Sequence, residues 1–180
     1  MPAMTTDTSG AVLPSPADEA RFWALLEAAW AELGDEPAAV RQRLIQRAPG
    51  AYPEWLYDLD PWMDPFLERL RGLSDGLGSG ELTGLDRVLE RKLYDLDRRD
   101  VYDATPATEE GFLHARGYIV AAGQEFYQAV QAEPRLAIED AWCEGMGWFF
   151  AHLHRERFGG DPETGSGISR ESYSNEAGWQ

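Results

Sequence analysis

The stretch TEEGFLHARGYIV, residues 108–120, carries the helical pattern on which the fold prediction depends. Thr108 stands at the position of a helix N-cap, and Glu109 and Glu110 follow in the first turn, where the helix dipole favours negative charge. At about 100° per residue, the apolar side chains gather on one side. The stretch therefore predicts a helix over residues 108–123. Its apolar face comprises Phe112, Ala115, Ile119 and Ala122.

Two features of this predicted helix are candidates for function. Glu110 and His114 lie one turn apart on the side opposite the apolar face, either as a solvated pair or, with Glu109, as an acid–base or metal-binding group. Arg116 falls within the apolar face itself. A guanidinium there needs carboxylate partners from the protein or holds an anionic ligand, and both alternatives remain open. The candidate partners are Asp103, Glu144 and Glu171.

The same periodicity recurs outward from this helix in both directions. Ser15-Pro16 combines an N-cap hydroxyl with a proline at the first helical position. Residues 74–84 are rich in Gly and Ser and predict a loop, and no alternating strand pattern is present. The chain is therefore predicted to be an all-α, compact single-domain helical bundle of about five to seven helices. Further helices are expected at 36–48, 65–73, 85 to about 100, 124–134 and 136–157.

The 180-residue composition sets limits on domain number and partners. One domain fits this length, with a flexible leader at 1–16 and a helical domain at 17–179. The net charge of −16 argues against binding to nucleic acid or anionic membranes. A cationic partner is more compatible with it, although an acidic surface also serves solubility. No apolar run approaches the roughly 20 residues that cross a bilayer.

Cysteine and histidine usage argues against a disulfide framework and a metal site. Cys143 is the only cysteine, which favours a reducing, cytoplasmic setting. His152 and His154 diverge by about 200° on a helix and cannot chelate one ion together. His152 is expected to be the core histidine. No G-x-S-x-G, P-loop or dinucleotide fingerprint occurs, so neither a cofactor nor a metal is expected.

Two other segments carry expectations about exposure. The predicted helix at 36–48 is expected to place Arg41, Arg43 and Arg47 on its outer face. The final twenty residues have a polar composition that is typical of disorder, but Trp179 can bury a large apolar ring. We therefore expect an ordered C-terminal tail that docks on the helices. Its candidate ligand-binding residues are Arg170, Glu171, Asn175 and Trp179.

Three segments together resemble a small bacterial family known as domain of unknown function 4240. The similarity covers most of residues 20–179 and is poorest at about 50–84. The segments that carry it are Phe22-Trp23, EEGFLHARGYIVAAGQEFY at 109–127 and SRESYSNEAGW at 169–179.

The resemblance implies a bacterial cytoplasmic protein in which the tail belongs to the domain. Members of the family often carry cysteine or serine and aspartates where this chain has Thr108-Glu109-Glu110. That departure weakens the idea of a nucleophile at this position. The family has no assigned activity, so the resemblance leaves the function open.

Two classes of function are compatible with these patterns. The first, which we favour, is a protein-interaction or regulatory module that binds a cationic partner such as a basic protein. The alternative is a small-molecule binder or an enzyme of hydrolase or transferase type. In the alternative, Arg116 clamps an anion, Glu110 and His114 form an acid–base pair, and the tail acts as a lid. A pocket lined by Arg116, Glu109 and the tail favours the enzyme, whereas an uninterrupted acidic face favours the module.

Overall fold

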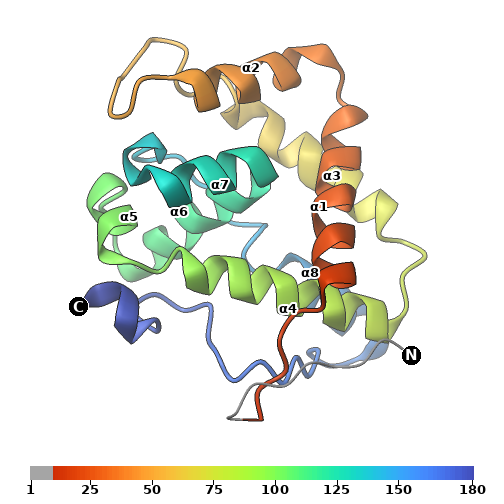
Figure 1. Ribbon diagram of the computed structural model, residues 1–180. Coiled ribbons are helices and arrows are strands. Elements are labelled where there is room, and N and C mark those ends of the chain that lie inside the picture. The colour runs from red at the N-terminus through yellow and green to blue at the C-terminus, as the bar shows by residue number, and fades with distance from the viewer. Residues whose placement is uncertain (1–9) are drawn as a thin grey trace.

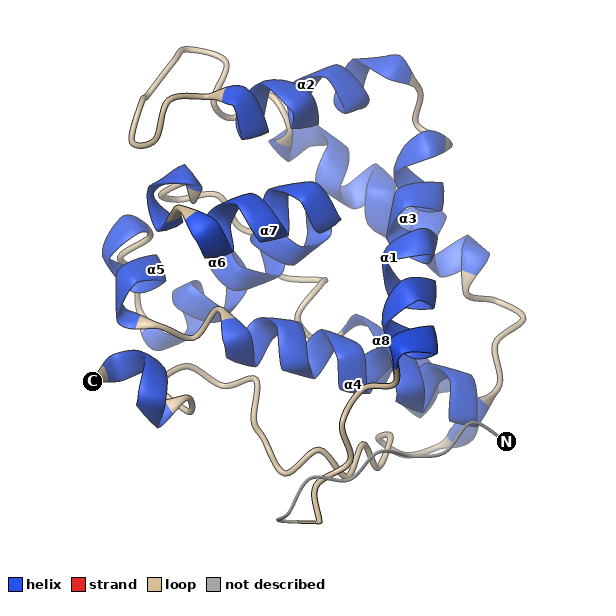
Figure 2. Cartoon of the chain, in the orientation of Figure 1, coloured by secondary structure: helices blue, strands red, loops and turns tan. Residues whose placement is uncertain are grey.

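The computed structural model describes residues 10–180, and within them the protein is an all-α bundle (Figures 1 and 2). The predicted fold class is confirmed, and β-strands are absent from the described residues. The α-helices are α1 (Pro16–Ala31), α2 (Asp35–Gln46), α3 (Met63–Leu73), α4 (Ser79–Asp95), α5 (Arg99–Ala104), α6 (Glu109–Ala121), α7 (Gln124–Ala132) and α8 (Phe149–Phe158). Short 3₁₀ helices lie at η1 (Asp60–Trp62), η2 (Pro134–Leu136) and η3 (Glu176–Trp179).

Two helix starts follow directly from the sequence. The Ser15 hydroxyl accepts a hydrogen bond from the Asp18 amide at 3.0 Å and caps α1. The Thr108 hydroxyl accepts one from the Gly111 amide at 3.1 Å and caps α6. Such caps stabilise a helix by about 1 kcal/mol each. The Thr108 cap fixes the position of the acidic first turn of α6.

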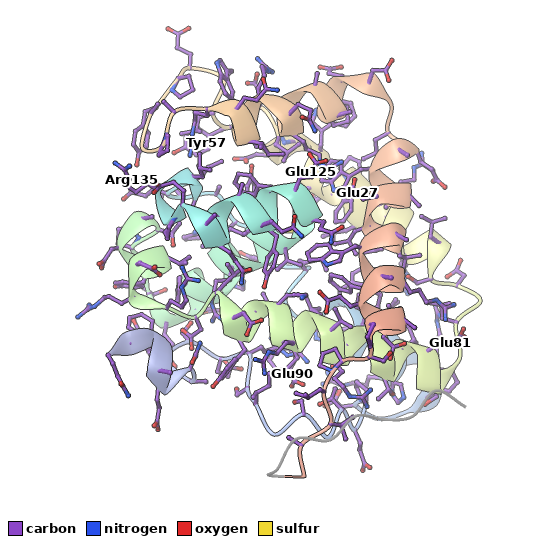
Figure 3. All side chains as sticks on the ribbon, in the orientation of Figure 1. Glu27, Tyr57, Glu81, Glu90, Glu125 and Arg135 are labelled. Atoms are coloured by element: carbon purple, nitrogen blue, oxygen red, sulfur yellow. The ribbon has the colours of Figure 1, made fainter. Side chains whose placement is uncertain are left out.

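Helix α6 is the centre of the fold, because every residue from Gly111 to Ala121 except His114 is buried. Helix α4 packs on α1, α6 and α8, and α7 lies between α6 and α2 (Figure 1). Figure 3 shows side chains filling the space that these ribbons enclose. In this core, Trp30 stacks on Phe66 at 4.5 Å between ring centroids and donates to the Ala121 carbonyl. Each buried aromatic ring of this kind contributes about 2–3 kcal/mol.

The predicted final helix at 136–157 is wrong over its first half. Residues 137–148 are irregular, and the α-helix begins only at Phe149, the first residue of α8. The Cys143 amide donates to the His114 carbonyl at 3.1 Å, and a Cβ at Gly117 would lie 2.8 Å from the Cys143 carbonyl. The segment 143–148 thus packs directly on the backbone of α6, and the Cys143 amide is free to donate to α6 because it is not inside a continuous helix. The predicted loop at 74–84 is also too long, because α4 already begins at Ser79.

The C-terminal tail is ordered, as predicted. Beyond α8 it runs along α4 and ends beside α5 (Figure 1). Its Arg170 side chain forms two hydrogen bonds with the Asp86 carboxylate on α4, at 3.0 and 2.8 Å. Both side chains are at most 3% exposed. The tail is therefore held to the bundle by a buried ion pair.

The predicted leader falls partly outside the described residues, because residues 1–9 are not among them. Next to α1, the Val12 amide donates to the Gly165 carbonyl at 2.8 Å, so this segment contacts the tail. None of the helices in residues 10–180 is long and apolar enough to cross a membrane.

Candidate functional site: an acidic groove

An open groove of about 570 Å³ lies where α6, the segment 143–148, α8 and the tail meet. Four glutamates line it, together with two histidines and two apolar side chains. Among the residues that the structure describes, no lysine or arginine lines this space. The residues of this acidic groove are Glu109, Glu110, Leu113, His114, Glu144, Trp148, His152 and Glu171.

One helix cap and two tertiary hydrogen bonds bring these side chains together. The Thr108 cap sets Glu109 and Glu110 at the start of α6. The bond from the Cys143 amide to the α6 backbone places Glu144 beside that turn. The Ser172 hydroxyl donates to the Glu109 carbonyl at 2.6 Å, which brings the neighbouring Glu171 into the groove. Carboxylates from three chain segments therefore converge on one space.

Trp148 lines the groove and is supported by Arg170. The guanidinium carbon of Arg170 lies 4.3 Å from the Trp148 ring centroid. Arg170 is 3% exposed, and its charge is compensated by Asp86 at 2.8 Å and by Glu90 at 3.6 Å. The structure therefore places this candidate ligand-binding residue beside the groove as a support for Trp148, since the guanidinium is already paired.

Glu110 and His114 face the groove as a loose pair. The closest approach, from His114 Nε2 to Glu110 Oε1, is 3.7 Å, which is too long for a hydrogen bond. The Glu110 side chain is 85% exposed, whereas that of His114 is 17% exposed. The structure thus brings the predicted candidates Glu109, Glu110, His114 and Glu171 into one site.

Arg116 is buried and forms no ion pair with the candidate partners Asp103, Glu144 and Glu171, although the charge of Glu171 lies near it. Its Nη1 donates to the Leu93 carbonyl at 2.8 Å and its Nη2 to the Ser172 hydroxyl at 3.0 Å. It forms no ion pair with any described carboxylate, and burial lowers its pKa to about 10. The residue is 0% exposed and is absent from the lining of the acidic groove. The tail thus covers Arg116 instead of leaving it open to a ligand.

Asn175 and Trp179, two further candidates, bind Asp97, a residue that the sequence patterns did not indicate. The carboxylate of Asp97 is buried and accepts hydrogen bonds from the amides of Tyr173, Ser174 and Asn175 and from the Trp179 indole, at 2.7–3.0 Å. Trp179 also packs on Tyr102 with 5.5 Å between centroids. These residues anchor the tail. No sequence pattern marked Asp97, because its partners lie more than 70 residues further along the chain.

No family model, curated protein or solved structure matches this chain. The resemblance to domain of unknown function 4240 therefore stays a prediction. Within residues 10–180, no group of three or more histidine, cysteine, aspartate or glutamate side chains is arranged to hold a metal ion.

The prediction that His152 is a core histidine is wrong. His152 is exposed and lines the acidic groove, whereas His154 is buried. His154 Nδ1 contacts the Gly160 carbonyl, and its Nε2 lies 2.7 Å from the Ser79 hydroxyl. A hydroxyl and an imidazole in this relation can form a nucleophile–base pair. Neither residue lines the acidic groove, so we assign the pair a structural role in joining α4, α8 and the tail.

Proposed function

We propose that the protein is an interaction module whose acidic groove binds a basic segment of a partner protein. The observation that carries this proposal is the convergence of four glutamates on one groove in which no described cation competes for them. The net charge of −16 adds a long-range field that attracts cationic partners and speeds their association.

The chemistry of the groove fits lysine or arginine side chains. A single exposed ion pair contributes at most about 1 kcal/mol, so one carboxylate is insufficient. Four converging carboxylates can engage several cationic groups of one segment at the same time. Leu113 and Trp148 supply apolar surface against which the aliphatic stems of lysine and arginine pack.

The alternative of an enzyme or small-molecule binder has less support. It needs Arg116 to reach the space that Glu110 and His114 share. Arg116 is 0% exposed, and the tail covers it through the Ser172 hydroxyl. An anion could contact this guanidinium only after the tail had moved away. The Glu110–His114 pair could transfer protons, but without Arg116 the site lacks a group that holds an anionic substrate.

The proposal is tested by titrating a fluorescent oligo-arginine peptide and following its anisotropy. We expect saturable binding that falls about tenfold in the double variant Glu110→Gln/Glu144→Gln, because two of the four carboxylates lose their charge. The matched control is Glu54→Gln/Glu68→Gln. It changes the net charge equally, at two exposed residues outside the groove.

The two double variants separate a local site from a general charge effect. Equal weakening by both doubles would assign binding to net charge and contradict the groove. Absence of peptide binding to the unmodified protein at low salt would reject the interaction module itself.

A further inference from the structure

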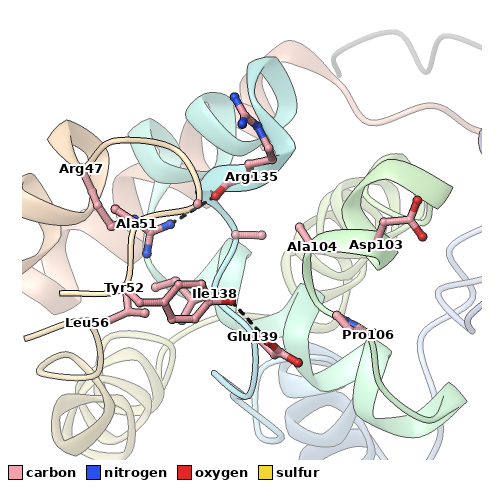
Figure 4. A pocket seen from close by; sticks show the side chains of 12 residues that line it. Arg47, Ala51, Tyr52, Leu56, Asp103, Ala104, Pro106, Arg135, Ile138 and Glu139 are labelled. Atoms are coloured by element: carbon pink, nitrogen blue, oxygen red, sulfur yellow. Dashed lines mark hydrogen bonds between the residues drawn. The ribbon is translucent and has the colours of Figure 1, made fainter. Parts of the chain in front are cut away.

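A second, smaller cavity lies on a different part of the molecule, between the segment after α2, the end of α5 and the residues after η2 (Figure 4). Its volume is about 160 Å³. An apolar cavity of about 150 Å³ is large enough for a benzene ring. Much of the wall is apolar, with Ala51, Leu56 and Ile138 among its residues. The cavity can therefore accept a ligand with a small apolar body.

Arg47 brings a buried positive charge to this cavity. The sequence pattern predicted Arg47 on the outer face of a helix. This prediction is wrong, because the residue is only 7% exposed. Its Nη2 donates to the Leu136 carbonyl at 2.7 Å and is 3.4 Å from the Arg135 carbonyl. Figure 4 shows its guanidinium between the chain at Ala51 and the chain at Ile138. Two carbonyls thus hold Nη2, while Nε has no hydrogen-bond partner among the described residues.

The guanidinium of Arg47 forms no ion pair with an acidic side chain of residues 10–180. Burial lowers the pKa of Arg47. The neighbouring groups that act in the opposite direction are all tyrosines. Two acidic residues, Asp103 and Glu139, also line the cavity, but neither forms an ion pair with Arg47. Asp103 is exposed, and the Glu139 carboxylate accepts a hydrogen bond from Tyr52 at 3.2 Å. A buried charge without a partner is unfavourable, so an anion that pairs with Arg47 in the cavity would offset part of that cost.

The other buried arginines, and the second arginine that lines the cavity, differ from Arg47 in this respect. Arg170 is paired with Asp86 at 2.8 Å. Arg116 has the charges of Asp97 and Glu171 near it and lines neither the cavity at Arg47 nor the acidic groove. Arg135 also lines the cavity, but its side chain is 68% exposed and paired with Glu133 at 3.1 Å. Arg87, the remaining buried arginine, donates its Nε to the Thr164 carbonyl at 2.6 Å. Among these five arginines, Arg47 alone is buried, has an N–H group without a partner among the described residues and lines a cavity.

We propose that this cavity binds a small organic monocarboxylate, with the carboxylate on Arg47 and an apolar body about the size of a benzene ring against Ala51, Leu56 and Ile138. A guanidinium matches the planar, two-oxygen geometry of a carboxylate, and such charge-assisted bonds are stronger than neutral ones. The site is independent of the acidic groove, since the two share no lining residue.

Benzoate is the probe that tests this site, titrated calorimetrically into the full-length protein at constant ionic strength. We expect one saturable site and binding of the uncharged analogue benzamide at least about tenfold weaker. Binding of phosphate but not benzoate, equal binding of benzamide and benzoate, or no benzoate binding would each overturn the proposal.

Three variants locate the bound carboxylate. Arg47→Met removes the charge, and Ala51→Leu fills the cavity while keeping the hydrogen bonds of Arg47, so both should weaken benzoate binding at least about tenfold. Arg71→Met is the matched control, because it removes an exposed, ion-paired arginine outside the cavity, and it should bind benzoate like the unmodified protein. If Arg47→Met fails to fold, Ala51→Leu decides alone. Unchanged affinity in Ala51→Leu, or a loss in Arg71→Met equal to that in Ala51→Leu, would place the ligand elsewhere and refute the site.

Discussion

Asp97 shows how much one buried carboxylate can organise. It is 0% exposed, and its two oxygens together accept four hydrogen bonds from the tail. Three of the donors are consecutive backbone amides, which must turn around the carboxylate to reach it. Hydrogen bonds to a charged group contribute about 1.5–3 kcal/mol, more than neutral ones. The conformation of residues 173–175 therefore depends on this one side chain.

Replacing Asp97 by asparagine should destabilise the protein by about 3 kcal/mol. The amide keeps the size of the side chain but turns one acceptor oxygen into an NH₂ group that faces other donors. Urea unfolding of the variant measures the loss. Asp103→Asn, at an exposed aspartate, is the control and should unfold at the original midpoint. An unchanged midpoint in Asp97→Asn would show that the tail does not depend on this carboxylate.

Cys143 should react only slowly with thiol reagents in the folded protein. The residue is 3% exposed, and burial raises the pKa of its thiol to about 12. Since the thiolate is the reactive form, both access and ionisation are suppressed. A thiol reagent at mildly alkaline pH should react slowly with the native protein and rapidly in denaturant. Equal rates in the two conditions would contradict the burial of Cys143.

Helix α6 and the segment 137–148 illustrate what sequence patterns can predict. The helix was predictable because its cap and apolar periodicity are local features. The irregular segment was not, since it depends on the glycine at 117 that lets a distant backbone approach. The same reason explains the groove: Glu109, Glu110 and His114 belong to one helix, whereas Glu144 and His152 reach it only through tertiary contacts. Burial of Arg47 likewise requires Leu136, which lies 89 residues away.

The tail should make a large contribution to stability. Truncation after Gly160 would leave the buried carboxylates of Asp86 and Asp97 without their partners. Breaking one buried ion pair costs about 3–5 kcal/mol, so we expect the melting temperature to fall by about 10 °C or more. Thermal unfolding followed by circular dichroism measures this change.

A control for the truncation removes only the exposed Gln180, which should leave the melting temperature unchanged. If the protein truncated after Gly160 melted together with the full-length chain, the buried bonds between the tail and α4 would carry no net stability. Binding of a dye specific for exposed apolar surface should increase only in the longer truncation.

The charge of the protein affects stability and binding in opposite directions. With a net charge of −16, repulsion among surface carboxylates opposes the compact state. Exposed ion pairs such as Arg71–Glu156 offset little of this repulsion. Added salt screens both effects, with a Debye length of about 10 Å at 0.1 M. Repulsion therefore dominates the response of the folded state to salt.

We expect the melting temperature to rise when sodium chloride is added, while affinity for the oligo-arginine peptide falls. Thermal unfolding and peptide anisotropy over the same salt series measure the two trends. A melting temperature that falls with salt would show that ion pairs outweigh repulsion. Peptide affinity that is independent of salt would contradict electrostatic recognition by the acidic groove.

The buried contacts between α4 and the tail also set an order of events during synthesis. Asp86 and Asp97 leave the ribosome long before Arg170 and the amides of 173–175, which follow them by 76 to 84 residues. Until those residues emerge, both carboxylates must remain hydrated, because burying them unpaired is too costly. The surface formed by α4 and the turn after it, which carries Asp86 and Asp97, is therefore the last to be covered. The nascent helices can associate earlier, but the native packing around α4 is completed only when the tail has been made.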